Sequence, residues 1–114
     1  MARNIVQAAR YNLAVSLARE LKDSGVTSNI VAPGSILTEM RRPRYMQMAQ
    51  THGWGETWEE IEARAVQAIA PNDTGHFGRP EEIAAAVAYL ASPLADYVSG
   101  ATIRVDGGTI RSAF

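Results

Sequence analysis

Histidine and glutamate side chains are the groups in this sequence that could bind a metal ion or transfer a proton. His52 and His76 lie in stretches predicted to be loops, and neither has a second ligand at the spacing of a metal site. We therefore expect solvated imidazoles and no metal centre. The glutamates are expected to be helix-start and surface charges rather than a paired acid and base; they are Glu59, Glu60, Glu62, Glu81 and Glu82.

A group of arginines is the second candidate, because clustered guanidinium groups can hold an anion. Arg41, Arg42 and Arg44 are expected to form a solvated basic edge, with an anionic-ligand site as the alternative. The large apolar side chains that follow are expected to pack the helices of this region together, although they could also line a pocket. These side chains are Met46, Met48, Trp54 and Trp58.

Length and composition limit the classes of protein. At 114 residues the chain can form one small domain or part of one. Its formal net charge of −1 gives no electrostatic reason to expect a nucleic-acid partner. No apolar run approaches the thickness of a bilayer, and the first residues do not resemble a signal or transit peptide, so we expect no membrane association. The absence of cysteine excludes disulfides and fits a cytoplasmic protein.

The pattern of apolar, glycine and proline residues predicts alternating helices and strands that would position these groups. The first helix is rich in alanine and leucine and apolar on two sides, so it has to be covered on two sides. The predicted elements are a helix over about 3–23, a strand over about 26–31, a helical insertion over about 38–75, a helix over about 80–91 and a strand over about 101–105. This order predicts a βαβ crossover preceded by a packing helix.

Local signals mark the starts of the helices. Within the insertion, Thr38 can cap a helix that runs to about Ala49. Thr57 and Glu60 have the spacing of a capping box, which predicts a second helix to about residue 69. Pro80 followed by two glutamates marks the start of the crossover helix.

Several sequence blocks, correctly ordered, resemble the C-terminal half of the short-chain dehydrogenase/reductase family. The blocks are Ser16–Leu21, Asn29–Thr38 with its N-x-V-x-P-G-x-I-x-T pattern, Phe77–Ala84 with F-G-x-P-E-E-I-A, and Ser99–Gly108 with its V-D-G-G ending. The resemblance implies an α/β fold that is the C-terminal part of a Rossmann-like doubly wound fold. It implies one partial domain over residues 1–114, with two parallel strands, a long packing helix, a helical lid insertion and a crossover helix.

The catalytic pair that the resemblance implies is missing. Aligning the helix on Ser16 puts the family's catalytic tyrosine at Arg3 and its lysine at Gln7. An arginine is protonated at neutral pH and cannot cycle a proton, and a glutamine carries no charge. The chain has a single lysine, Lys22, and no tyrosine has a lysine four residues after it. We therefore assign no catalytic residue.

The sequence also argues against a cofactor bound to the isolated chain. By resemblance, Pro33, Gly34, Ile36 and Thr38 occupy positions that approach the nicotinamide of NAD or NADP in the family. The family's glycine-rich phosphate loop is not in this sequence, so most of the dinucleotide would have no donor groups. We expect vestigial cofactor contacts at these residues and no cofactor bound to the isolated chain.

The leading hypothesis is a truncated short-chain dehydrogenase/reductase-like protein without oxidoreductase activity on its own. Two adjacent strands cannot pair both of their edges, and the first helix needs a partner. We expect a homo-oligomer through the first helix and the last strand. One alternative is half of an NAD(P)-dependent oxidoreductase that acts on a carbonyl or alcohol substrate once an N-terminal half complements it. Another is an assembly module that joins intact subunits of the family.

Overall fold

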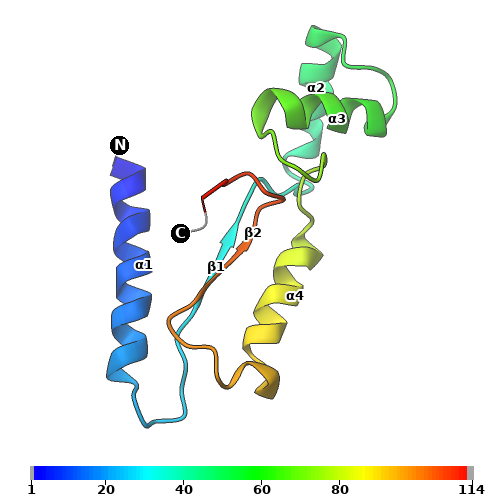
Figure 1. Cartoon of the computed structure of the whole chain (residues 1–114). Coiled ribbons are helices and arrows are strands. Elements are labelled where there is room, and N and C mark those ends of the chain that lie inside the picture. The colour runs from blue at the N-terminus through cyan, green and yellow to red at the C-terminus, as the bar shows by residue number, and fades with distance from the viewer. Residues whose placement is uncertain (1, 113–114) are drawn as a thin grey trace. The chain divides into compact units, whose positions relative to one another are not determined.

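A computed structural model describes residues 2–112, with side chains from Ile5 onward. The contacts divide the chain into two compact units. The first unit holds the residues up to Ala32 together with Ala84–Arg104. The second holds Pro33–Ile83 and the residues from Val105 onward. Figure 1 labels the helices and strands of both units.

Helix α1, Ala2–Glu20, opens the first unit. It contains neither glycine nor proline, the two residues that most destabilise the interior of a helix. The predicted helix extended to about residue 23, but the last residues form a turn instead. The N–H of Lys22 bonds to the carbonyl of Arg19 at 3.3 Å, and Asp23 and Gly25 have positive φ angles of 62° and 76°. These left-handed residues end the helix.

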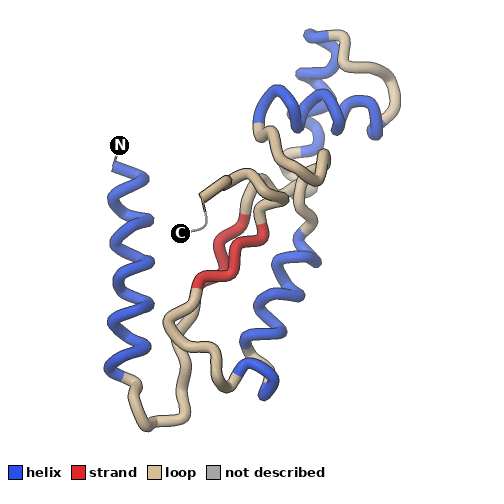
Figure 2. The backbone as a smooth tube through the Cα atoms, viewed as in Figure 1, coloured by secondary structure: helices blue, strands red, loops and turns tan. Residues whose placement is uncertain are grey.

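Strands β1, Ile30–Pro33, and β2, Thr102–Val105, pair in parallel (Figure 2). The predicted first strand began near Val26, whereas the ladder begins at Ile30, whose N–H bonds to the carbonyl of Ala101 at 2.9 Å. The side chain of Asn29 explains the late start. It donates to the carbonyl of Val98 at 2.8 Å and accepts from the N–H of Ala101 at 3.0 Å. The side chain of Asn29 therefore bonds to backbone groups that would otherwise bond to the backbone of a neighbouring strand.

Helix α4, Pro80–Leu90, connects the lid region to β2 through the 3-10 helix η1, Pro93–Ala95. Its start at Pro80 confirms the prediction, and its end differs from the predicted one by a single residue. Pro80 occupies the first turn because proline has no N–H that a helix start would leave unpaired. Glu81 and Glu82 follow in that turn, where the helix dipole favours negative charge.

Helices α2, Arg42–His52, and α3, Trp58–Ile69, pack on one another in the second unit. The capping box at the start of α3 is present. Thr57 accepts from the N–H of Glu60 at 3.3 Å, and the Glu60 carboxylate accepts from the N–H of Thr57 at 3.2 Å. The core beneath the helices is Tyr45, Ala65, Val66 and Phe77, with the Tyr45 and Phe77 rings stacked at 4.7 Å.

The observed architecture confirms an α/β fold with two parallel strands. Among the described residues, the buried side chains belong to the second unit, with Ala95 of the first unit as the exception. Within residues 2–112, no helix has both the length and the apolarity needed to cross a bilayer.

Candidate functional site

The carboxyl ends of β1 and β2 meet at Gly34, where the resemblance implies a cofactor-facing turn. The N–H of Gly34 bonds to the carbonyl of Val105 at 2.9 Å. A Cβ atom on Gly34 would lie 2.7 Å from the Cα of Asp106. Glycine is therefore required here by the close approach of the two backbones, whether or not a cofactor is bound nearby. Pro33, the last residue of β1, is exposed.

The rest of the turn pairs with the loop before α4. Ile36 forms a parallel bridge with Gly78, and the N–H of Leu37 donates to the carbonyl of Gly78 at 2.8 Å. Thr38 does not cap α2 as expected, because the helix begins only at Arg42 and its N-cap position is Arg41. The carbonyl of Thr38 instead accepts from the N–H of Arg41 at 2.9 Å, and the residue is exposed. An intervening turn thus separates Thr38 from the helix.

The turn after β2 does not form a phosphate cradle. The carbonyl of Gly107 accepts from the N–H of Asp73 at 2.7 Å. A Cβ on Gly107 would meet Thr74 Oγ1 at 2.7 Å, and one on Gly108 would meet Asp73 Oδ2 at 2.5 Å. The chain's own polar side chains, one of them acidic, fill the space beside both glycines. The described residues of this turn therefore do not fit the phosphates of a dinucleotide.

Arg3 and Gln7, the positions at which the resemblance implies the catalytic pair, lie on α1. The side chain of Arg3 lies outside the described residues, and Gln7 is exposed. The pair is four residues apart, which places both positions on one face of the helix. Neither residue type can act as a general acid there at neutral pH.

The Glu62 carboxylate, which we expected on the surface, is buried at 8% exposure. It accepts two hydrogen bonds from the guanidinium of Arg79, at 2.7 and 2.8 Å, and one from the N–H of Phe77 at 3.1 Å. It also accepts from the indole N–H of Trp58 at 3.1 Å. This carboxylate joins α3 to the loop that precedes α4. We call Trp58, Glu62, Phe77 and Arg79 the Glu62 clamp.

The Glu62 clamp had one signal in the sequence. Glu62 follows Ile61 and precedes Ala65 by a helical turn, so it lies beside the buried face of α3. The partner Arg79 is far along the chain, and nothing in the local pattern identifies it. The other glutamates are on the first turns of α3 and α4, as expected; they are Glu59, Glu60, Glu81 and Glu82.

Opposing effects set the pKa of Glu62. Burial raises it, but the hydrogen bonds from Arg79, the N–H of Phe77, the Arg79 charge and the indole of Trp58 together lower it below its ordinary value of 4.5. The carboxylate is therefore ionised at neutral pH. The same pairing raises the pKa of Arg79. The clamp is thus a charged structural link and not a proton donor at neutral pH.

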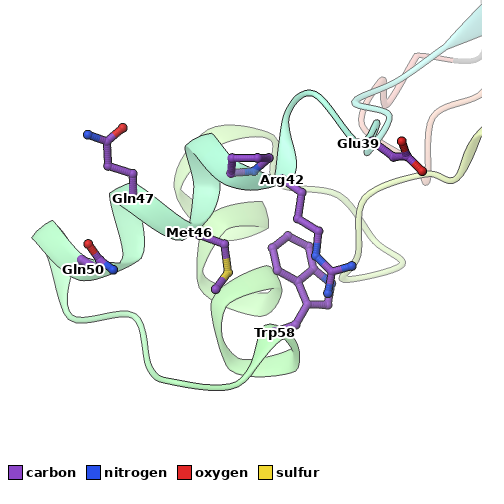
Figure 3. A pocket seen from close by; sticks show the side chains of 7 residues that line it. Glu39, Arg42, Met46, Gln47, Gln50 and Trp58 are labelled. Carbon is purple, nitrogen blue, oxygen red and sulfur yellow. The ribbon is translucent and has the colours of Figure 1, made fainter.

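A surface hollow lies on α2 beside the start of α3 (Figure 3). Its volume is about 590 Å³, within the range of small-molecule sites. The guanidinium of Arg42 lies 4.7 Å from the centroid of the Trp58 ring. Trp54, Trp58 and Met48 also pack against the core, which confirms their expected role, while Met46 lines the hollow. We call this hollow the lid groove.

The histidines are in different settings and do not form a site. His52 donates from Nδ1 to the carbonyl of Met48 at 2.8 Å and stacks on the Trp54 ring. His76 contacts the carbonyl of Phe77 through Nδ1 at 2.8 Å. No group of metal-binding side chains gathers anywhere in the part of the chain that the structure describes.

Comparison with known proteins places these features in a family context. The family described as enoyl-(acyl carrier protein) reductase matches residues 2–109. Galactitol 2-dehydrogenase (L-tagatose-forming) from Cereibacter sphaeroides is 39% identical over 100 residues, which are 88% of this chain and 34% of that protein. The 3-oxoacyl-[acyl-carrier-protein] reductase MabA from Mycobacterium bovis is 40% identical over 102 residues, 90% of this chain and 35% of that protein. The chain thus spans about a third of the length of these relatives.

A solved structure shares the fold. It is an NADPH-bound short chain oxidoreductase from Pseudomonas aeruginosa that contains an atypical catalytic center. The match has a TM-score of 0.77 and 32% identity, and it covers 93% of this chain and 37% of that one.

Proposed function

The chain belongs to the short-chain dehydrogenase/reductase family, and we propose that these 114 residues carry no hydride-transfer activity by themselves. The observation that carries the proposal is the edge where β1 and β2 end. The space beside its glycines is filled by the backbone of Asp106 and by the side chains of Asp73 and Thr74. Within the described residues this edge holds no general acid beside a charged partner and no phosphate-binding loop.

The proposal includes self-association of the chain in the cytoplasm. In the first unit, apolar side chains of α1 are exposed, Ile5 at 65%, Leu13 at 67% and Leu17 at 42%. Exposed apolar side chains of this number on one helix are typical of an interface. Each of the paired strands also has one edge without a partner strand in this sheet. A second copy that covers α1 and pairs with β2 would bury both features.

The second candidate is an NAD(P)-dependent oxidoreductase that is completed by an N-terminal segment. The same exposed helix and free strand edge would fit the remainder of a Rossmann-like sheet. The relative with an atypical catalytic center is NADPH-bound, so an unusual centre does not by itself exclude cofactor binding. A third candidate, an assembly module for intact subunits of the family, would use the same surfaces.

A cofactor titration tests the proposal. NADH and NADPH are added to the chain, and energy transfer from Trp54 and Trp58 to the reduced nicotinamide is followed. We expect no saturable signal even at millimolar cofactor. Saturable binding at micromolar concentration would overturn the proposal. Repeating the titration after adding the separately expressed N-terminal two thirds of MabA separates the second candidate, which requires binding and carbonyl-dependent NADPH oxidation in the mixture.

A further inference from the structure

The first unit has a hollow of its own, on different residues from the lid groove. It lies where the end of α1, the segment before β1 and the loop between η1 and β2 meet, and its volume is about 620 Å³. That volume is within the range of small-molecule sites. We call it the α1-end hollow. Its lining includes Ala18, Leu21, Val26, Thr27, Asp96 and Ser99.

Backbone contacts hold the walls of the α1-end hollow together. The N–H of Gly100 donates to the carbonyl of Ser28 at 2.7 Å, which joins the loop before β2 to the segment before β1 (Figure 1). A Cβ atom on Gly100 would lie 3.7 Å from the Cβ of Ala18, so the same loop also packs against α1. The walls are therefore preformed, and a ligand would not have to order them.

The turn after α1 forms the rim of the hollow. Asp23, which lines it, has a φ of 62°, a left-handed conformation that is uncommon for residues other than glycine. The hydroxyl of Ser24 holds this turn, because it donates to the carbonyl of Leu21 at 2.6 Å and accepts from the N–H of Val26 at 3.1 Å. Backbone conformations of this kind cluster at ligand sites, which makes this end of the unit a candidate.

Two opposite charges from different elements line the hollow without a partner. Arg19 comes from the last turn of α1, and Asp96 comes from the loop that follows η1. Within residues 5–112, neither side chain forms a hydrogen bond or an ion pair. The other charges of the lining, Lys22 and Asp23, offset one another at 4.0 Å. A ligand that carries both an anion and a cation would therefore complement the hollow, whereas a ligand of single charge would leave one of these groups unpaired.

We propose that the α1-end hollow binds a zwitterionic α-amino acid with an aliphatic side chain. The ligand carboxylate pairs with the Arg19 guanidinium, which can donate two parallel N–H bonds, and the ligand ammonium group pairs with the Asp96 carboxylate. Ala18, Leu21 and Val26 supply apolar surface for the ligand side chain. Both charged residues are exposed, so each pairing is weak and the affinity is in the millimolar range. This binding goes beyond the proposed function, because it requires neither a nucleotide nor a partner chain.

Titration of the ¹⁵N-labelled chain with L-leucine tests the proposal, with the backbone N–H signals of Thr27 and Ser99 as reporters. We expect saturable shifts of both signals in the millimolar range. N-acetylleucine lacks the ammonium group and leucinamide lacks the carboxylate, so each should bind about fivefold more weakly, the upper value for the loss of one exposed ion pair. Equal affinity for the three compounds would overturn the proposal, because only the aliphatic side chain would then be recognised.

Single substitutions assign each charge of the ligand to its partner. Arg19→Gln should weaken leucine binding about fivefold and leave leucinamide binding unchanged, because leucinamide has no carboxylate. Asp96→Asn should weaken leucine binding to the same degree and leave N-acetylleucine binding unchanged. Arg10→Gln and Glu20→Gln remove exposed charges of α1 outside the hollow and should not change the affinity. Losses of similar size in these control variants would overturn the proposal in favour of a general charge effect.

The titration also separates this proposal from the proposed function. Saturable leucine binding that depends on Arg19 and Asp96 supports the hollow whatever the cofactor titration shows. Absence of saturable shifts up to the solubility of leucine would overturn the hollow and leave the proposed function unaffected. Leu13→Glu, which targets the proposed interface, should keep the affinity for leucine. Loss of binding in that variant would overturn the inference that a single chain forms the site.

Discussion

At the residue scale, the Glu62 clamp is the best-defined polar arrangement of the described residues. The carboxylate has partners for both oxygens, and the donors come from α3, from the backbone of Phe77 and from Arg79. A buried carboxylate is tolerated only when such partners offset the loss of water. Removing the negative charge of Glu62 leaves the guanidinium of Arg79 without its anion.

We predict that Glu62→Gln destabilises the second unit by about 2 kcal/mol, since the Arg79 side chain is partly exposed and the pair is not fully desolvated. Urea unfolding followed by tryptophan fluorescence measures the change. Glu59→Gln is the matched control, because Glu59 is exposed on the same helix and should change stability by no more than about 0.5 kcal/mol. Equal effects of the two substitutions would contradict the structural role of Glu62.

The lowered pKa of Glu62 predicts an acid-dependent loss of stability. Because the folded pKa is below the ordinary value of 4.5, the clamp contributes fully above pH 4.5 and its contribution is lost as the pH falls through the folded pKa. The difference in free energy of unfolding between the unchanged chain and Glu62→Gln should therefore shrink below pH 4.5. Unfolding curves at a series of pH values check this, and a constant difference would contradict it.

At the element scale, local chemistry accounts for most helix boundaries. The start of α3 depends on the capping box, and the end of α2 depends on Gly53, whose φ of 65° is left-handed. The start of α4 depends on Pro80. No residue of α4 is buried, and Val87 is 51% exposed. The helix forms from its own signals, but the described residues do not cover its apolar face.

We predict that Thr57→Ala costs about 1 kcal/mol, the usual value of an N-cap hydroxyl. The substitution removes the acceptor for the N–H of Glu60 while leaving the core residues in place. Thermal unfolding followed by circular dichroism measures the loss. Thr51→Ala is the control, because its hydroxyl bonds only to the carbonyl of Gln47 within α2. A Thr57→Ala protein as stable as the control would show that the cap does not hold the helix start.

At the scale of the whole molecule, the two units differ in how much of their apolar surface they bury. The second unit has a core of aromatic and aliphatic side chains, whereas the first buries only Ala95 among the described residues. A helix with exposed Leu13 and Leu17 loses the stabilisation that burial of such side chains supplies. The proposed self-association would supply a surface that covers these side chains.

We predict that the chain self-associates and that Leu13→Glu dissociates it, because the substitution puts a charge into the proposed interface. Sedimentation velocity at micromolar concentration gives the mass of each species. Leu94→Glu is the control, since Leu94 is 84% exposed on η1, outside the proposed interface. A monodisperse monomer of the unchanged chain would contradict self-association. Dissociation by both variants would show that the interface is not confined to α1.

The sequence by itself determined the family, the kinds of elements and their order, because capping, proline placement and apolar runs act within a few residues. The tertiary structure alone decided that β1 begins at Ile30, that Glu62 is buried and that Arg42 stacks on Trp58. Two of the three partners of Glu62 stand fifteen and seventeen residues away in the chain, at Phe77 and Arg79. Contacts of that separation form only when packing brings the segments together, so no local pattern encodes them.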